Sequence, residues 1–119
     1  MSGGPAGDAA VELAATRRAE QRILALMAEY CDSIDRGDLD GCAALFRRGR
    51  WGIAGNLAEG EAAVRALLAN VTLYDGVPLT RHLMTNVRIE VATDAGRATA
   101  RSCIRVMQAV PPDCALQPI

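Results

Sequence analysis

The chain has 119 residues, of which 50% are hydrophobic and 23% charged, and its formal net charge is −1. This composition is typical of one globular domain and excludes a fibrous or intrinsically disordered chain. All 13 basic residues are arginine, which excludes a lysine Schiff base and a lysine-containing phosphate loop.

His82 is the single histidine, so metal motifs that need two histidines are excluded. We expect no metal site. Acidic and basic residues are interspersed and only 3% of residues are aromatic, so we expect no nucleic-acid partner. No apolar run reaches the roughly 18 residues that a membrane span needs, so we expect no membrane association.

The N-terminal fifteen residues are rich in glycine and alanine and predict a flexible leader, within which a helix is expected to start near Asp8, followed by a single domain over residues 16–119. This leader has no basic region and no long apolar stretch, so we expect a cytoplasmic protein with reduced thiols. Cys31 and Cys42 lie in helical patterns and are interpreted as small core residues.

Two helices are predicted next. The first starts at Thr16, and Gly37 ends it in the left-handed conformation that glycine allows. Asp38 is the expected N-cap of a short second helix. One apolar stripe follows helical spacing along the first helix. It consists of Ile23, Leu24, Met27, Tyr30, Cys31 and Ile34.

A turn at residues 47–50 precedes a predicted short strand over 51–54, which Gly55 and Asn56 break. The turn carries a basic cluster, Arg47, Arg48 and Arg50, that we interpret as solvated. A third helix is expected over residues 60–70, because Val64, Leu67, Leu68 and Val71 share one face. Residues 72–78 are a predicted loop.

The remainder alternates with the period of a β-strand. A strand over 82–91, a turn at Asp94-Ala95-Gly96 and a returning strand over 97–110 form a predicted hairpin, and residues 114–119 begin a further strand. Helices followed by a meander predict an α+β domain. Two long strands make a poor sheet, so we expect that C-terminal strands are missing or that a partner supplies them.

The first strand contains a conflict in its pattern. His82 shares strand parity with Arg88 and Glu90, opposite the apolar set of Leu83, Val87 and Ile89. Either both faces of the sheet are covered at this end, or a bulge reorients the start of the strand.

Three side chains are candidates for chemistry. Tyr30 lies on the buried stripe, where a satisfied core tyrosine competes with a donor to a substrate oxygen. Asp35 stands beside the chain reversal and either faces solvent or points inward. His82 is either a structural histidine or a general base.

Several motifs together resemble the SnoaL-like branch of the nuclear transport factor 2-like superfamily. They are Y-x-x-x-x-D-x-x-D-x-D from Tyr30, A-L-F before a tryptophan strand, G-E-A-A-V opening the third helix, and H-x-x-x-N from His82. The similarity covers residues 22–110. It implies a conical α+β barrel, in which a curved, mainly antiparallel sheet wraps around the N-terminal helices.

Relatives that resemble this chain include scytalone dehydratase, bile-acid 7α-dehydratase and ketosteroid isomerase. The resemblance implies a dyad of Asp35 and His82, with Tyr30 as a pocket hydroxyl and no cofactor. The chain departs from scytalone dehydratase in lacking a second histidine. No acidic residue lies between Arg47 and Ala58, which disfavours the ketosteroid isomerase mechanism.

The resemblance therefore implies a cofactor-independent lyase, of dehydratase type, that acts on an apolar polycyclic or aromatic small molecule. An isomerase or cyclase with the same dyad, and a non-catalytic binding or assembly subunit, stay open. The family implies a homodimer or homotrimer through the outer sheet face. The expected substrate pocket is lined by Met27, Ile34, Phe46, Trp51, Leu68, Met84 and Asn86.

Overall fold

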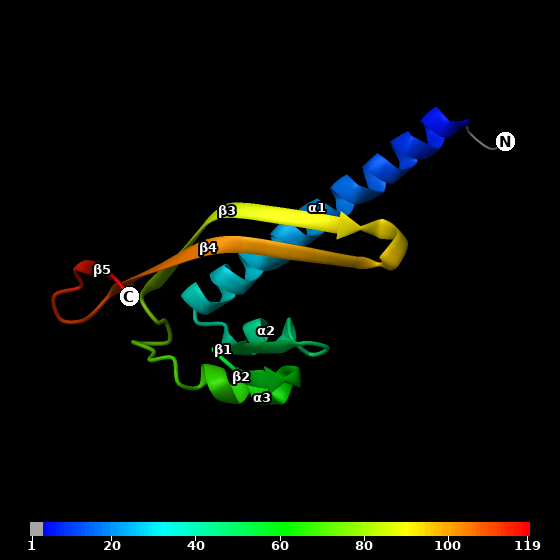
Figure 1. Ribbon diagram of the computed structural model, residues 1–119. Coiled ribbons are helices and arrows are strands. Elements are labelled where there is room, and N and C mark those ends of the chain that lie inside the picture. Colours follow the sequence, from blue (N-terminus) through cyan, green and yellow to red (C-terminus); the bar gives the residue numbers. More distant parts are fainter. Residues whose placement is uncertain (1–3) are drawn as a thin grey trace. The chain divides into compact units, whose positions relative to one another are not determined.

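The structure is a computed structural model that describes residues 4–119; Met1, Ser2 and Gly3 of the expected leader lie outside the described residues. In chain order its elements are α1 (Pro5–Asp35), α2 (Leu39–Ala44), β1 (Arg50–Ile53), β2 (Asn56–Glu59), α3 (Gly60–Leu68), β3 (Thr80–Ala92), the 3-10 turn η1 (Thr93–Ala95), β4 (Arg97–Ala109) and β5 (Leu116–Pro118) (Figure 1). The predicted α+β class, with N-terminal helices, is confirmed.

The described chain divides into two compact units. The first contains residues up to Met27 together with Met84–Cys103, and the second contains Ala28–Leu83 together with Ile104–Ile119. The sheets are β1-β2 and β3-β4-β5; β1 pairs antiparallel with β2, and β4 pairs antiparallel with β5.

A packed core occupies the second unit. α3 contacts α2 and both strands of the β1–β2 hairpin (Figure 1). Val64 and Leu68 of α3 are 0% and 2% exposed, as the apolar face of the predicted third helix requires. Cys42 is also fully buried and Cys31 is 4% exposed, so both thiols are core residues, as predicted. The buried core cluster consists of Ile34, Leu39, Cys42, Ala43, Ala58, Val64 and Leu68.

The reversal between α1 and α2 follows the prediction. Gly37 has φ +81°, and its N–H donates to the carbonyl of Ile34 at 2.9 Å. The Asp38 carboxylate accepts from the N–H of Gly41 at 2.9 Å, which makes Asp38 the N-cap of α2. Asp35 is the last residue of α1, so the chain reversal follows it directly.

Replacing Gly37 with alanine is expected to destabilise the fold more than the same change at Gly76. Both residues have positive φ, which costs a residue with a Cβ roughly 1–2 kcal/mol. A Cβ on Gly37 would also overlap the carbonyl oxygen of Gly76, whereas one on Gly76 would meet open space. Urea unfolding of the two variants measures the difference, and equal losses would contradict this close approach.

Two local expectations differ from the structure. α1 begins at Pro5, three residues before the helix start expected near Asp8, and it continues without a break through Thr16, so residues 5–15 of the expected leader are helical. Gly55 and Asn56 do not end the β structure. Ala54 and Gly55, with φ +49° and +87°, form a two-residue turn, and Asn56 starts strand β2. The prediction missed β2 because only Ala58 of its four residues is buried.

The burial pattern of β3 resolves the conflict in its sequence. His82 and Met84 are half-buried in the first part of the strand, and Val87, Ile89 and Val91 in the second, so burial switches parity. Asn86 lies at the switch with φ +53°. A left-handed residue inside a strand is typical of a β-bulge. Of the two explanations that the sequence left open, covered faces or a bulge, the structure therefore shows the bulge.

Candidate functional site

Asp35 and His82 meet in the second unit. Nδ1 of His82 lies 2.6 Å from Oδ1 of Asp35. The backbone N–H of His82 donates to Oδ2 of the same carboxylate at 2.8 Å, and the hydroxyl of Thr80 donates to Oδ1 at 2.8 Å. The two side chains are 6% and 11% exposed. Two donors from one strand, the Thr80 hydroxyl and the His82 N–H, together with the ring contact of His82, therefore hold a carboxylate that comes from the end of α1.

This arrangement fixes the proton of a neutral His82. An ionised carboxylate only accepts hydrogen bonds, so the short contact places the imidazole proton on Nδ1. Nε2 then carries a free lone pair. A histidine held in this way has the form of a general base, because the carboxylate also stabilises the imidazolium after proton uptake.

The local sequence explains why these groups converge. α1 ends at Asp35, so the side chain projects from the last turn of the helix. Thr80 and His82 are two residues apart in β3 and therefore share one face of the strand. Sequence reasoning missed Thr80. Its parity with His82 was the available signal. A carboxylate that contacts the His82 ring also lies near the side chain two residues earlier on the same face of the strand.

Tyr30 lies beside the dyad in the second unit. Its ring centroid is 6.3 Å from that of His82 and 6.0 Å from that of Phe46, both with edge-on geometry. The indole N–H of Trp51 donates to the Tyr30 hydroxyl oxygen at 3.0 Å. Burial raises the pKa of the Tyr30 phenol, and the hydrogen bond from Trp51 opposes this increase. The phenol is therefore protonated at neutral pH and available as a donor.

Replacing Trp51 with phenylalanine is expected to raise the pKa of Tyr30 further. The variant loses the N–H that stabilises the phenolate and keeps an aromatic ring. The chain has two tyrosines, so a Tyr74→Phe background leaves Tyr30 as the only absorbing phenol. Alkaline titration of its ultraviolet absorbance measures the change. An unchanged or lower pKa would show that the indole does not donate to Tyr30.

The residues expected to line the substrate pocket fall into both units. Ile34 and Leu68 belong to the buried core of the second unit, and Phe46 and Trp51 pack against it, partly buried. Met27, Met84 and Asn86 belong to the first unit. Met27 and Met84 are half-buried, and Asn86 is exposed. A shared pocket formed by all seven residues stays a prediction.

Asp35 also lines a pocket with other charged side chains. A polar pocket is lined by Asp32, Asp35, Arg36 and Arg81. Arg36 also forms ion pairs with Glu29 and Asp38 on an exposed surface, where such pairs contribute little. The predicted basic cluster of Arg47, Arg48 and Arg50 is exposed, which agrees with a solvated turn.

The described residues offer limited chemistry beyond this site. Burial raises the pKa values of the Cys31 and Cys42 thiols, which disfavours the reactive thiolate. Within residues 4–119 no three His, Cys, Asp or Glu side chains come together as metal ligands would. No helix in the same range is both long and apolar enough to cross a membrane.

Comparisons with known proteins agree with this α+β architecture. The family described as SnoaL-like domain matches residues 15–117. A variant of Rv3472, a protein of unknown function from Mycobacterium tuberculosis, is 33% identical over 78% of this chain and 56% of its own, with a TM-score of 0.63. ActVI-ORFA from Streptomyces coelicolor is 21% identical over 84% of this chain and 76% of its own, with a TM-score of 0.68. No curated protein matches the chain.

The helices that precede antiparallel strands define an α+β domain, a fold that the solved structures share. The match over residues 15–117 covers most of the chain, and the chain belongs to the SnoaL-like domain family. The family predicted from the motifs around Tyr30 and His82 is thus confirmed. The chain spans 56% of the length of the Rv3472 structure.

Proposed function

We propose that this protein is a cofactor-independent lyase that removes water from an apolar bicyclic or polycyclic hydroxyketone. His82 acts as the general base, Asp35 orients and stabilises it, and Tyr30 donates a hydrogen bond to the substrate. The observation that carries the proposal is the 2.6 Å contact between Nδ1 of His82 and Oδ1 of Asp35, with Thr80 fixing the same oxygen.

The proposed reaction is a β-elimination. Nε2 of His82 takes a proton from the carbon beside the carbonyl, and the electron pair moves into the enolate. The enolate then expels the β-hydroxyl, which leaves as water after gaining a proton, and a carbon–carbon double bond forms. The imidazolium next to Asp35 holds the abstracted proton and returns it to the departing oxygen, so protons and electrons balance without a cofactor.

Tyr30 is assigned to the carbonyl oxygen in this scheme. The hydrogen bond from Trp51 occupies an acceptor position on the phenol oxygen, which leaves the O–H to be donated. A donor that has itself accepted a hydrogen bond is strengthened by polarisation. A donor at the carbonyl stabilises the charge that develops on oxygen as the proton is removed.

The probe 3-hydroxy-1-tetralone tests this reaction class directly. It has an acidic C–H between its carbonyl and its hydroxyl-bearing carbon, and loss of water followed by tautomerisation gives 1-naphthol. We expect protein-dependent formation of 1-naphthol, followed by its fluorescence. Formation at the rate of buffer alone, together with no binding of the probe, would contradict the proposed substrate class.

A non-catalytic ligand-binding or assembly subunit is the second candidate. Family membership by itself does not establish an activity. What favours the enzyme is that the Asp35 and His82 side chains are 6% and 11% exposed and hydrogen-bonded to each other, since a partner-binding histidine needs no oriented lone pair. A cytoplasmic location is part of this proposal.

A further inference from the structure

Strand β3 is an edge strand of the described chain. The strand order is β3-β4-β5, so β4 is the only described neighbour of β3 (Figure 1). An edge strand presents unpaired N–H and C=O groups that can pair with another strand. β3 is 13 residues long, and its stretch after the bulge at Asn86 contains neither proline nor lysine, residues that commonly protect such an edge.

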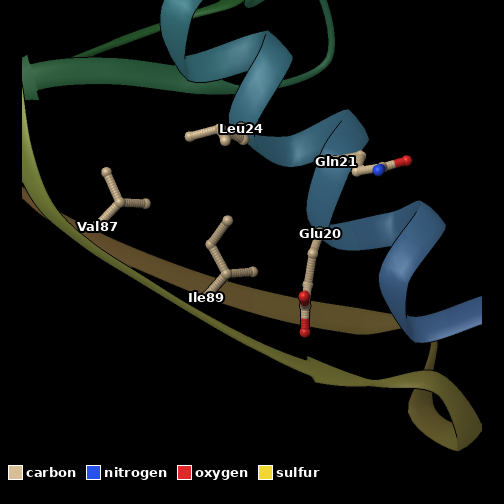
Figure 2. A pocket seen from close by; sticks show the side chains of 5 residues that line it. All are labelled: Glu20, Gln21, Leu24, Val87 and Ile89. Carbon is tan, nitrogen blue, oxygen red and sulfur yellow. The ribbon is translucent and has the colours of Figure 1, made fainter. Parts of the chain in front are cut away.

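The part of β3 after Asn86 has two distinct faces. Val87, Ile89 and Val91 are half-buried, whereas Arg88 and Glu90 are exposed. Figure 2 shows that the side chains of Val87 and Ile89 point toward α1, where Leu24 lines the same pocket. Because α1 lies over this apolar face within the first unit, a partner has access to the edge of the strand and to its charged face.

We infer that a second copy of this chain pairs with β3, antiparallel and about a two-fold axis through Ile89. Residues opposite each other in an antiparallel pair place their side chains on the same face. With Ile89 facing its own copy, Arg88 lies opposite Glu90 of the second copy, and Glu90 opposite the second Arg88. Val87 then faces the second Val91 across the apolar side. The two-fold symmetry repeats each of these contacts.

Charge complementarity selects this register from the alternatives. A two-fold axis through Arg88 would place two arginines opposite each other, and one through Glu90 would place two glutamates opposite each other. Like charges directly opposite are destabilising in a sheet, and opposite charges are stabilising. An axis through Val87 leaves both charges opposite uncharged residues. One through Val91 would place Arg88 opposite Asp94, which lies beyond the strand in η1, and would leave Glu90 opposite Ala92. The register through Ile89 pairs both charges and also matches the β-branched residues, a combination favoured in cross-strand pairs.

This interface differs from the one that the family resemblance implies. That expectation used the outer sheet face, whereas the inferred contact uses the sheet edge and extends the β3-β4-β5 sheet across the two-fold axis. The inference does not depend on the activity proposed for His82, because all of the residues involved belong to the first unit.

Charge reversal tests the pairing in solution. Sedimentation equilibrium of the full chain is expected to show a dimer. Arg88→Glu and Glu90→Arg, made singly, should each weaken it at least about ten-fold, because each places two like-charged pairs across the axis. The double variant Arg88→Glu with Glu90→Arg restores both opposite-charge pairs and should recover the wild-type dissociation constant, which also shows that the substitutions permit folding.

Cysteine cross-linking tests the register itself. In a background in which Cys103 and Cys114, both exposed, are replaced by serine, Ile89→Cys should form an intermolecular disulfide with its own copy. Val87→Cys should not cross-link alone but should cross-link when mixed with Val91→Cys. A chain that sediments only as a monomer overturns the inference. So does a dimer whose dissociation constant ignores the charge reversals, or in which Ile89→Cys does not cross-link.

Discussion

Replacing His82 with alanine is expected to lower the protein-dependent turnover of 3-hydroxy-1-tetralone by about 10²–10⁴-fold, the usual contribution of a positioned general base. The chain has one histidine, so no second imidazole is available to replace it. The loss should appear in kcat more than in KM, because the ring acts on the proton that moves in the transition state. Initial rates of 1-naphthol formation measure the effect.

A matched control separates the chemistry from general effects of substitution. Arg97 is the exposed first residue of β4, and Arg97→Ala should retain the wild-type rate. Thermal unfolding of both variants shows whether the His82→Ala protein is folded at the assay temperature. A folded His82→Ala variant that keeps its turnover within a few-fold of wild type would remove the base from the mechanism.

Truncating Leu68 to alanine is expected to lower the free energy of unfolding by about 2–5 kcal/mol. Leu68 is 2% exposed and lies at the end of α3, in the cluster that also contains Val64 and Cys42. Removing its branched end leaves a cavity between α3 and α2, and the neighbours relax only partly. Denaturant unfolding monitored by circular dichroism measures the loss.

Leu57 provides the control for this core prediction. It lies in β2 and is 60% exposed, so Leu57→Ala should change stability by less than about 0.5 kcal/mol. The comparison keeps the chemical change the same and varies only the burial. Similar losses for the two variants would mean that the α2, α3 and hairpin cluster is not the stabilising core of the second unit.

Much of the fold was predictable because its patterns are local. The period of α3, the cap of Asp38 and the alternation of β3 each depend on residues close in sequence. β2 was missed because its four residues have no apolar alternation, and a turn of Ala54 and Gly55 lacks the usual Asn-Gly signal. The start of α1 at Pro5, three residues before the helix start expected near Asp8, was missed because glycine and alanine near Pro5 resemble a linker in composition.

The candidate site was predictable only in part. Asp35 and His82 are 47 residues apart, so no local pattern joins them, and the family resemblance supplied the pair. The hydrogen bonds from Thr80 to Asp35 and from Trp51 to Tyr30 could not be predicted from the sequence, because a hydrogen bond is defined by the direction and distance between its two groups. The parity conflict around His82 was informative. It reflects the left-handed Asn86, at which the half-buried positions of β3 change from one strand parity to the other.

The most direct test of the account is the tautomer of the single histidine, read from the ¹⁵N shifts of its two ring nitrogens at neutral pH. If Asp35 accepts the ring proton, Nδ1 of neutral His82 is protonated and Nε2 is bare. The Asp35→Asn variant loses the carboxylate acceptor and should shift the population toward a proton on Nε2. A wild-type spectrum in which Nε2 carries the proton would contradict the account, because the proposed base would then have no free lone pair on the nitrogen that faces away from Asp35.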